Sequence, residues 1–446
     1  MPVRGIVLFA ALAASIPICF FQPFYGILAW TVISFVNPQS TLSYWPVAQS
    51  FPWAVAIAIP TLAGLVVFER RWERMVSRET ILIAALWVWF TITSVVCTHN
   101  PLFADHAEDA WYRWRFVSKI LLMTVVTMAI VRTPARLRML VLVIAGCFGI
   151  FVVKTFPFIL STGGQFRVYG PDNSMIADNN DFGLALNMTL PLYFFLAQTE
   201  SKRWLKRSLG ILFLITIPAI FFTYSRGALL GLCAVLAVMF WRSKKRFVLI
   251  PVAVFAMFFA MLFAPESWKN RMDPTSPNAM DTSARARINA WHFAWNLASD
   301  FPITGGGFAT FTPSLFARYA PNGADIHGPH SVYFQILGEH GFVGLALYLA
   351  LLLSCFMSLR TVAKTARVYD DGVSIQYANM LALSIVGFIV SGTFLGRAYF
   401  DYFFTLVACV VVLKRTAAEQ WANLEPAHSA DEQDAPAMEG QWAHPL

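Results

Sequence analysis

The sequence predicts an all-α protein that crosses a membrane many times. Of the 446 residues, 57% are hydrophobic and only 13% are charged, whereas soluble globular proteins carry about 25% charged residues. The apolar residues form repeated runs that are long enough to span a bilayer as helices. Short basic loops separate many of these runs, which is typical of loops on the cytoplasmic side. A β-barrel would instead show short segments of alternating hydrophobicity.

The charge and the cysteines argue against several other classes of protein. The net charge of +8 does not indicate a nucleic-acid partner, because the basic residues cluster in short loops between apolar runs. The first apolar run lacks a small-residue cleavage site followed by a soluble domain, so we expect no cleaved signal peptide. No cysteine has metal-ligand spacing, and we expect buried small side chains at Cys19, Cys97, Cys147, Cys233, Cys355 and Cys409.

The chain before residue 78 contains three apolar pieces. Residues 5–36 are interrupted by Pro17 and Pro23, so they form two short helices or one broken helix. A further run covers residues 53–68, and the basic loop 69–78 follows it. Because the N-terminus and this loop both look cytoplasmic, an even number of crossings must lie between them. We therefore predict that residues 5–36 make one net crossing or contain a piece that does not cross.

Ten further spans are predicted after residue 78, which gives about twelve in total. Between the first two of them, residues 99–119 suit an interfacial helix, because this interval is polar and carries Trp111, Tyr112 and Trp114. The ten predicted spans are residues 81–97, 120–131, 139–153, 182–197, 209–222, 228–241, 247–264, 332–353, 377–390 and 403–412.

Polar intervals divide the chain into four predicted parts. These are an N-terminal transmembrane bundle (1–264), a large outer loop with interfacial helices (265–329), C-terminal transmembrane helices (330–415) and a disordered cytoplasmic tail (416–446). The inner loops are short and basic, whereas the outer loops carry varied polar residues. Chemistry is therefore expected on the outer face.

Arg226 is the first candidate for that chemistry. It lies in the short outer turn TYSRG (223–227), against the bias of basic residues for the inner side. A charge at membrane depth is retained mainly where it has a partner or a task. The alternative is an arginine that reaches out to a lipid headgroup phosphate.

Two more arginines lie in the large outer loop. Residues 283–297 are expected to form an amphipathic surface helix with Ser283 as its N-cap and Trp291 one turn after Arg287. Arginine binds phosphate well because its planar fork makes paired, charge-assisted hydrogen bonds. Arg285 and Arg287 are therefore candidates, and a solvated arginine on an interfacial helix is the alternative.

The segment ADNNDFG (177–183) opens an apolar span. Asp178 or Asn179 can cap this helix, but capping explains one polar residue better than four in a row. Amides at a membrane surface can also hold sugar hydroxyls. Arg167 and Lys154 are two further cations on the predicted outer side.

His330 stands where the large outer loop meets the next span. A histidine here is suited to accept a proton because its pKa lies near neutral pH, and capping the helix is the alternative. His327 and His330 could share a metal, but no HExxH pattern accompanies them, and we expect neither a metal nor a cofactor. Gly341 and Gly344 should lie inside the helix and allow a close neighbour that fixes it, so that it aims His330. His340 is expected to be a packing residue.

Four motifs in this order resemble the O-antigen ligase and polymerase superfamily of bacterial envelope enzymes. They are DNNDFGLALNMTLPL (178–192), SRGALLG (225–231), RINAWHFAW with FPITGGGF (287–308) and HSVYFQILGEHGFVG (330–344). The resemblance covers most of residues 160–415. The N-terminal part, with FVNPQ (35–39), is similar to members linked to exosortase and polysaccharide gene clusters.

This resemblance implies a multi-spanning glycosyltransferase fold of the GT-C type. It implies transfer of O-antigen polysaccharide from undecaprenyl diphosphate to a lipid A–core sugar, on the periplasmic face of the bacterial inner membrane. His330 then corresponds to a general base, and Arg226 and Arg287 to arginines that bind the donor diphosphate. Inversion at the anomeric carbon is expected, without metal or ATP. The other candidates for substrate binding are Arg167, Asn179, Asn180, Tyr224, Arg285 and Trp291.

Three other functions stay open at this point. An O-antigen polymerase or a protein O-oligosaccharyltransferase would use the same lipid-linked donor, so the motifs do not separate them from a ligase. A flippase or transporter of the lipid-linked glycan belongs to a different class. Against it, the spans show no evident inverted repeat, and the polar residues concentrate on one face and not at the midplane.

Overall fold

The structure of the chain, a computed structural model, describes residues 2–43, 45–68, 76–241, 264–272 and 281–424, together with 247, 251, 255, 261 and 262. Throughout these residues the regular elements are helices, which confirms the all-α prediction. The predicted span 247–264 lies largely outside them, and the total of about twelve crossings stays a prediction. Six described helices are long and apolar enough to cross a membrane: Val3–Phe21, Arg78–Thr98, Pro134–Ser161, Arg203–Phe221, Val332–Val368 and Gly372–Gly392.

The described helices account for most of the described residues. Their order is α1 (Pro2–Phe21), α2 (Pro23–Val36), α3 (Pro38–Thr41), α4 (Pro46–Ser50), α5 (Trp53–Phe68), α6 (Arg78–Thr98), η1 (Pro101–His106), α7 (Ala107–Ile130), α8 (Pro134–Ser161), α9 (Asn179–Thr199), α10 (Arg203–Phe221), α11 (Arg226–Trp241), α13 (Glu266–Met272), α14 (Asp281–Asp300), α15 (Pro313–Tyr319), α16 (Val332–Val368), α17 (Gly372–Gly392) and α18 (Asp401–Ala422).

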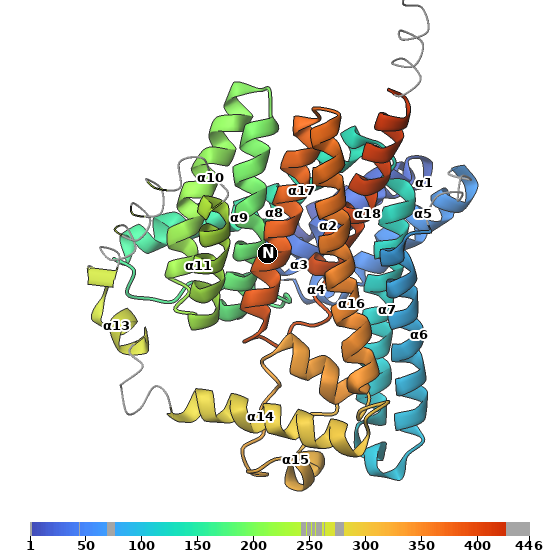
Figure 1. The fold of residues 1–446 in the computed structure, drawn as a ribbon, viewed down its shortest axis with the longest axis vertical. Helices are drawn as coiled ribbons and strands as arrows, with labels where there is room; N and C mark the ends of the chain where they lie inside the picture. The colour runs from blue at the N-terminus through green and yellow to red at the C-terminus, as the bar shows by residue number, and fades with distance from the viewer. Residues whose placement is uncertain are drawn as a thin grey trace, which may run out of the picture.

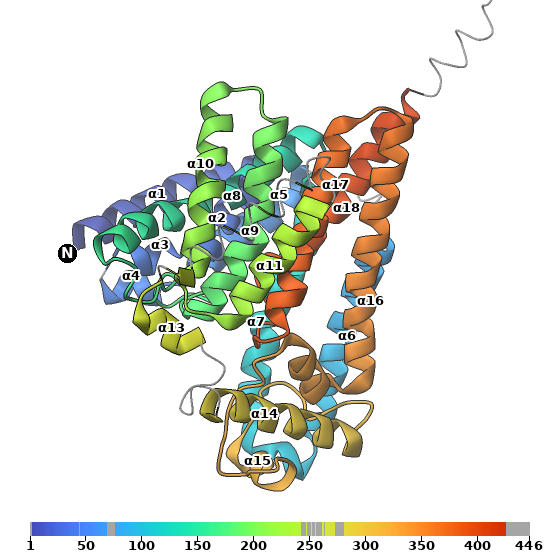
Figure 2. The same ribbon diagram turned by 60° about the vertical axis from the view of Figure 1, so that its left-hand side comes forward.

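The bundle is built around α9, which is buried along most of its length. α9 packs against α17, α10 and α11, while α18 packs against α7 and α17. Figures 1 and 2 show that α6, α7 and α16 reach below the lower ends of α9 and α11, and that α14 lies across them with α15 beneath. The last turns of α18 lie at the opposite, upper end. The predicted outer loop therefore gathers at one end of the bundle.

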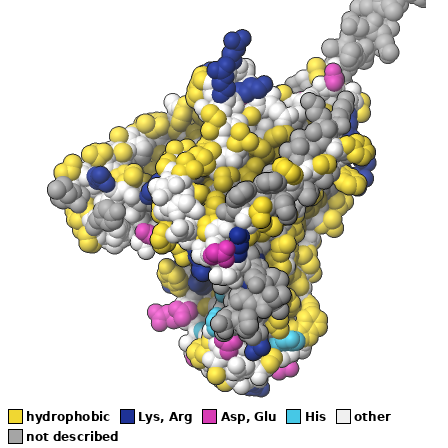
Figure 3. All heavy atoms as spheres, turned by 90° about the vertical axis from the view of Figure 1, so that its left-hand side faces the viewer, with side chains coloured by type: hydrophobic (Ala, Val, Ile, Leu, Met, Phe, Trp, Pro, Cys, Tyr) yellow, Lys and Arg dark blue, Asp and Glu magenta, His cyan; other side chains and the backbone are white. Residues whose placement is uncertain are grey.

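The surface of the bundle is mostly apolar. Figure 3 shows hydrophobic side chains over much of one face, as expected for helices that meet lipid. The histidines seen in this view lie at the narrower lower end. Basic side chains project at the upper end in this view, and Figures 1 and 2 show the α9–α10 connection at that end. The exposed basic residues in and after this connection are Lys202, Arg203, Lys206 and Arg207.

The N-terminal region forms two helices, as one of the two sequence interpretations expects. α1 ends at Phe21 and α2 begins at Pro23, whereas Pro17 lies inside α1 without ending it. Both helices approach α5 closely. A side-chain carbon on Gly64 would overlap the carbonyl oxygen of Phe20, so only a glycine lets α1 and α5 come this near.

The prediction of an interfacial helix at residues 99–119 is wrong. The chain makes the short helix η1 and then runs as one helix, α7, from Ala107 into the bundle. The aromatic residues of this interval help to pair α7 with α6, because Trp114 Nε1 donates a hydrogen bond to Thr91 Oγ1 at 2.9 Å. Trp87 Nε1 of α6 donates in return to Ser118 Oγ at 2.9 Å.

Three smaller expectations also need correction. Ser283 lies within α14, which already begins at Asp281, so it is not the N-cap. α18 continues to Ala422, beyond Arg415, where the sequence predicts the disordered tail to begin. Five of the six cysteines are buried as expected, but Cys233 is exposed, which fits a small apolar side chain that faces lipid.

Gly341 divides α16 into two segments, so the expectation that it lies inside one helix after His330 is wrong. Its φ of 67° and ψ of −170° are not helical. A side chain at this position would stand 2.6 Å from the carbonyl oxygen of Pro302 and 2.5 Å from that of Ile303. The amide of Phe342 donates to the Pro302 carbonyl at 2.8 Å. Residues 332–340 thus form a short helix above α14, and the long helix starts only after Gly341 (Figure 1).

Candidate functional site

His330 is held in a backbone conformation that few residues other than glycine adopt. Its φ is +41°, and such a conformation persists only where the surrounding structure imposes it. On one side, Trp291 Nε1 donates a hydrogen bond to the carbonyl of Pro329 at 2.8 Å. On the other side, a side chain at Gly396 would stand 3.4 Å from the amide nitrogen of His330. The histidine therefore lies between α14 and the segment that precedes α18.

The imidazole of His330 is half-buried and has positive neighbours. Burial lowers its pKa from the ordinary 6.5, and the charges of Arg287, His327 and Arg397 lower it further, while Asp178 acts in the opposite direction. The neutral imidazole is therefore favoured at neutral pH. This is the form that can accept a proton.

Helical spacing explains why Arg287 lies near this histidine. Arg287 precedes Trp291 by four residues in α14, so the two side chains lie on the same side of the helix. Trp291 holds Pro329, and its ring also stacks on Phe334 at 5.1 Å with an angle of 8°. The structure thus brings two of the sequence candidates, Arg287 and Trp291, to His330.

Arg226 begins α11, immediately after the turn that ends α10. The start of α9 fixes this turn, because Asn179 Nδ2 donates to the carbonyl of Thr223 at 2.7 Å. The neighbouring Gly227 packs against the segment before α18, since a side-chain carbon added to it would stand 3.1 Å from Phe394 Cβ. The turn, the start of α9 and the segment 391–400 therefore meet.

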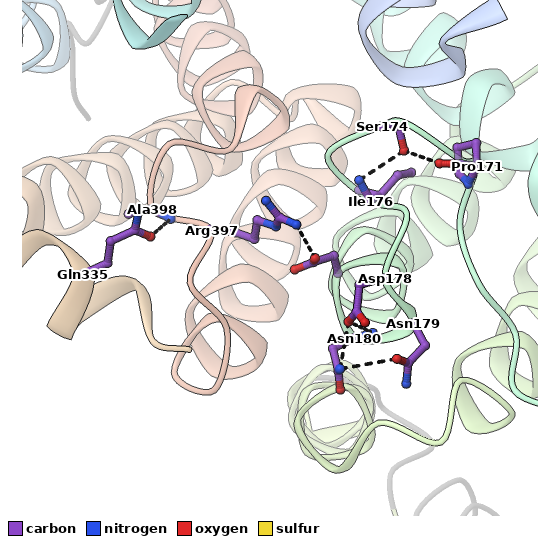
Figure 4. Close-up of polar contacts among 10 residues, drawn as sticks. Pro171, Ser174, Ile176, Asp178, Asn179, Asn180, Gln335, Arg397 and Ala398 are labelled. Atoms are coloured by element: carbon purple, nitrogen blue, oxygen red, sulfur yellow. Dashed lines mark hydrogen bonds and ion pairs between the residues drawn. The ribbon is translucent and has the colours of Figure 1, made fainter. Parts of the chain in front are cut away.

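Arg397 is a site residue that the sequence interpretation missed. It lies in the segment before α18 and pairs with Asp181 of α9 at 2.5 Å. Figure 4 shows Arg397 between the start of α9 and the helix that carries Gln335, whose Oε1 accepts a hydrogen bond from the Ala398 amide at 3.2 Å. One signal could have identified it. Like Arg226, it is an isolated arginine in an apolar outer segment.

The remaining candidates differ in their surroundings. Asp178 is the N-cap of α9, as predicted, and accepts from the Asn180 amide at 2.8 Å; Asn180 Nδ2 also donates to it at 2.8 Å. Tyr224 is buried, and its hydroxyl bonds to the Gly164 carbonyl at 2.8 Å. Tyr224 therefore supports the turn.

Arg167 and Arg285 are both exposed. Arg167 precedes Val168, whose amide donates to the Phe222 carbonyl at 3.0 Å, so this cation lies beside the α10–α11 turn. Arg285 lies on α14, two residues before Arg287. Among the described residues, no three His, Cys, Asp or Glu side chains gather as metal ligands would.

A buried chain of hydrogen bonds supports the site from within. Tyr399 donates to the Glu339 carboxylate, and its hydroxyl lies 2.8 Å from His340 Nε2. His340 Nδ1 lies 2.7 Å from Thr93 Oγ1 of α6. If Tyr399 donates to Glu339, His340 Nε2 must donate to Tyr399 and Nδ1 must accept from Thr93. The predicted packing role of His340 is consistent with its complete burial.

The arrangement as a whole combines a neutral imidazole with several guanidinium groups. The imidazole can take a proton from a hydroxyl, and arginines can bind a phosphate-bearing anion. Residues 211–349, which contain Arg226, Arg287 and His330, match the family model described as O-Antigen ligase.

This match supports the resemblance of the chain to the O-antigen ligase superfamily. Residues 3–201 match a second model, which is described only as a family of unknown function. The chain is also similar to the teichuronic acid biosynthesis protein TuaE of Bacillus subtilis (strain 168), with 23% identity over 281 residues. That match covers 58% of the chain and 55% of TuaE, so it spans about half the length of the relative.

Proposed function

We propose that the protein transfers a glycan from undecaprenyl diphosphate to a sugar hydroxyl of lipid A–core. The observation that carries this proposal is the half-buried His330, whose pKa is lowered by burial and by Arg287, within the part of the chain that matches the O-Antigen ligase model. A neutral base beside cations is what an attack by a hydroxyl on a phosphate-linked sugar requires.

His330 acts as the general base in this proposal. The acceptor hydroxyl oxygen forms a bond to the anomeric carbon of the donor while an imidazole nitrogen of His330 takes its proton. The bond from the anomeric carbon to the phosphate oxygen breaks, and its electron pair leaves with undecaprenyl diphosphate. A single displacement of this kind inverts the anomeric configuration. The leaving diphosphate supplies the driving force, so ATP is not consumed.

Arg226 and Arg287 bind the diphosphate of the donor. Their planar guanidinium groups can make paired hydrogen bonds to phosphate oxygens, and they stabilise the charge that develops on the leaving group. Neither a bound metal nor a nucleotide is needed for this step. Asn180, Arg167 and Arg285 have accessible side chains that can contact the glycan. Asn179 is buried and contributes by holding the turn before Arg226.

The proposed reaction takes place on the periplasmic side of the bacterial inner membrane. Support comes from the position of α14 and the start of α16 at the end of the bundle opposite the last turns of α18 (Figure 1). The basic α9–α10 connection lies at that opposite, upper end. The proposal retains the GT-C type of fold and the four-part organisation, with the outer loop between two groups of membrane helices.

Two related activities use the same donor. A polymerase is the second candidate, because the similar protein TuaE is named for teichuronic acid biosynthesis and not for ligation. A protein O-oligosaccharyltransferase differs in its acceptor, a serine or threonine. A flippase would move the lipid-linked glycan without forming a bond.

One experiment separates these functions. Purified protein in detergent or liposomes is mixed with an undecaprenyl-diphosphate glycan and either lipid A–core or a serine- and threonine-containing peptide, without ATP. Glycan on lipid A–core is the expected product. Longer lipid-linked chains would identify a polymerase, a glycopeptide would identify a protein glycosyltransferase, and movement of lipid without a new bond would identify a flippase.

A His330→Ala variant tests the mechanism in the same assay. Loss of a general base reduces the rate by about 10²–10⁴-fold, so transfer at the wild-type rate would exclude this role. Arg226→Lys keeps the charge and removes the planar fork. Activity of this variant equal to the wild type would argue against phosphate binding at Arg226.

A further inference from the structure

α14 presents apolar residues on two different faces. One face is buried against α15 and includes Phe293 and Leu297. The second face carries Ile288, Trp291 and Trp295 at positions i, i+3 and i+7. Ile288 is 50% exposed and Trp295 is 53% exposed. This second face packs on α16 only in part, through Trp291 and Trp295, so its exposed side chains leave apolar surface for a further contact.

This second face forms one wall of an open groove. The groove has a volume of about 390 Å³ and is lined by Ile288, Trp291, His292, Trp295 and Phe334. Phe334 comes from the short helix after His330 and stacks on Trp291. The groove therefore lies between α14 and the first segment of α16.

The groove continues into the surface of α16 that faces lipid. Trp295 meets Phe342, at the start of the long segment of α16, with 5.6 Å between ring centroids. Phe342 begins a row of exposed apolar side chains along this membrane helix, which continues with Leu349, Leu353 and Met357. Exposed apolar residues in a row on a spanning helix contact hydrocarbon chains. A chain from the bilayer can thus reach the groove without crossing water.

The other end of the groove meets the candidate site. Arg287 directly precedes Ile288 in α14, and its charge acts on His330. Trp291 lines the groove and also binds the Pro329 carbonyl, next to His330. A cation at one end and an apolar channel at the other match an amphiphile with an anionic head and a hydrocarbon tail.

We propose that this groove binds the first part of the isoprenoid chain of the lipid donor, while its diphosphate lies at Arg287 and His330. The inference rests on the proposed function and adds the place where the lipid is recognised. The occupant is the donor chain and not bulk phospholipid, because the groove ends at His330 and Arg287. In the proposed function these two residues act on the diphosphate and sugar of the donor. Burial of the chain contributes binding free energy in proportion to its length, so the protein should select long chains.

Donors that differ only in their lipid provide the test. The Michaelis constant is measured for a glycan on undecaprenyl diphosphate and for the same glycan on geranyl diphosphate, in one detergent. For the wild type, we expect a KM at least about tenfold lower with the undecaprenyl donor, since each buried methylene adds roughly fourfold in affinity. The ratio of the two KM values is the readout.

Three variants of the groove and one surface control separate the possible outcomes. Ile288→Gln and Trp295→Gln make the groove polar, and the KM ratio should fall towards one. Ile288→Trp keeps the surface apolar but fills the groove, and it should raise KM for the undecaprenyl donor alone; a face that only contacts bulk lipid would tolerate this change. Tyr112→Gln on α7, where the side chain is 63% exposed, is the matched surface control and should keep the wild-type ratio.

The outcomes distinguish this inference from the function on which it rests. Transfer by the groove variants with an unchanged KM ratio would overturn the inference and leave the proposed function intact. A wild type that transfers from neither donor would overturn both. Size-exclusion chromatography of each variant shows whether it is folded, and Ile288→Trp gives an independent answer if the glutamine variants aggregate.

Discussion

Arg397 and Asp181 form an ion pair of 2.5 Å although 216 positions separate them in the chain. The pair joins the segment before α18 to the first turn of α9. Asp181 is almost completely buried, at 8% exposed, whereas Arg397 is 31% exposed. The charge of Arg397 also lowers the pKa of His330. The ion pair therefore fixes the segment 391–400 and, with it, a charge that acts on the candidate base.

An Asp181→Asn variant should be less stable than the wild type. Removal of one partner from a fully buried ion pair costs about 3–5 kcal/mol, and the partial exposure of Arg397 reduces the expected cost to about 1–3 kcal/mol. Thermal unfolding in detergent measures the difference. Asp109→Asn, at an exposed position of α7, is the matched control and should unfold at the wild-type temperature. Equal stability of the two variants would show that the pair contributes nothing.

The pH dependence of transfer should report the environment of His330. Burial and the charges of Arg287, His327 and Arg397 lower its pKa below 6.5, against the effect of Asp178. The imidazole then stays neutral to lower pH, so kcat/KM should fall only when the pH drops below the ordinary range of histidine. Removal of a positive charge raises the pKa, and Arg287→Gln should therefore move this acid limb to higher pH. The measurement is kcat/KM between pH 4 and pH 8, roughly the range in which histidines titrate.

Arg226→Gln is the control for this shift. Arg287 is the charge that lowers the pKa of His330 most, so the loss of Arg226 should lower transfer but move the acid limb less than the loss of Arg287 does. If the acid limb of Arg287→Gln stays at the wild-type pH, Arg287 does not act on the pKa of His330. The pH dependence of His330 modification by diethyl pyrocarbonate gives the same pKa without any need for activity.

The sequence predicted the local features of this molecule well. Apolar runs located the described membrane helices. The preference of aspartate and asparagine for N-caps left Asp178 and Asn179 as candidates, and Asp178 is the cap. The four-residue spacing of Arg287 and Trp291 placed both on one side of α14. These features depend on residues close together in the chain, and the physical rules for them are local.

Features that depend on distant contacts were missed. The ion pair of Arg397 with Asp181 joins two segments whose meeting no local pattern indicates. The polar and aromatic residues near Trp114 suit an interface equally well until α6 supplies Thr91 as a partner. The bend at Gly341 depends on the close approach of Pro302 and Ile303, 38 or more positions earlier.

Gly341→Ala should destabilise the protein. The φ of 67° is unfavourable for alanine, and the added carbon would meet backbone oxygens at 2.5 and 2.6 Å. A strained backbone alone costs about 1–3 kcal/mol, and the steric contacts add to that cost. Gly146→Ala in α8 is the control, because its added carbon meets nothing within 4 Å. Alanine favours the helix there by up to about 1 kcal/mol.

Thermal unfolding of both glycine variants decides whether the bend is required. We expect a lower unfolding temperature for Gly341→Ala and an equal or higher one for Gly146→Ala. Two unfolding temperatures equal to that of the wild type would mean that α16 can straighten at no cost. The position of His330 would then not depend on the bend.

The hydroxyl of Tyr399 should contribute more to stability and to transfer than the hydroxyl of a comparable buried tyrosine. It lies between the Glu339 carboxylate and His340 Nε2, in a space enclosed by the rings of Phe90 and Phe308. Tyr399→Phe removes both hydrogen bonds and leaves a buried carboxylate with one donor fewer. Loss of a hydrogen bond to a charged group costs about 1.5–3 kcal/mol. Transfer should also decrease, because Tyr399 holds the segment that carries Arg397.

Tyr402→Phe is the matched comparison for this last prediction. Tyr402 is also fully buried, but its hydroxyl bonds to the neutral hydroxyl of Thr189 at 3.1 Å, for which the expected cost is about 0.5–1.5 kcal/mol. Chemical denaturation of the two variants gives the difference in the free energy of unfolding, and the transfer assay gives the rates. If Tyr402→Phe lost as much stability and activity as Tyr399→Phe, burial alone would account for both. A larger loss in Tyr399→Phe would assign the effect to the charged carboxylate of Glu339. In that case the double variant Tyr399→Phe, Glu339→Gln should recover part of the lost stability, because it no longer buries a charge that lacks its donor.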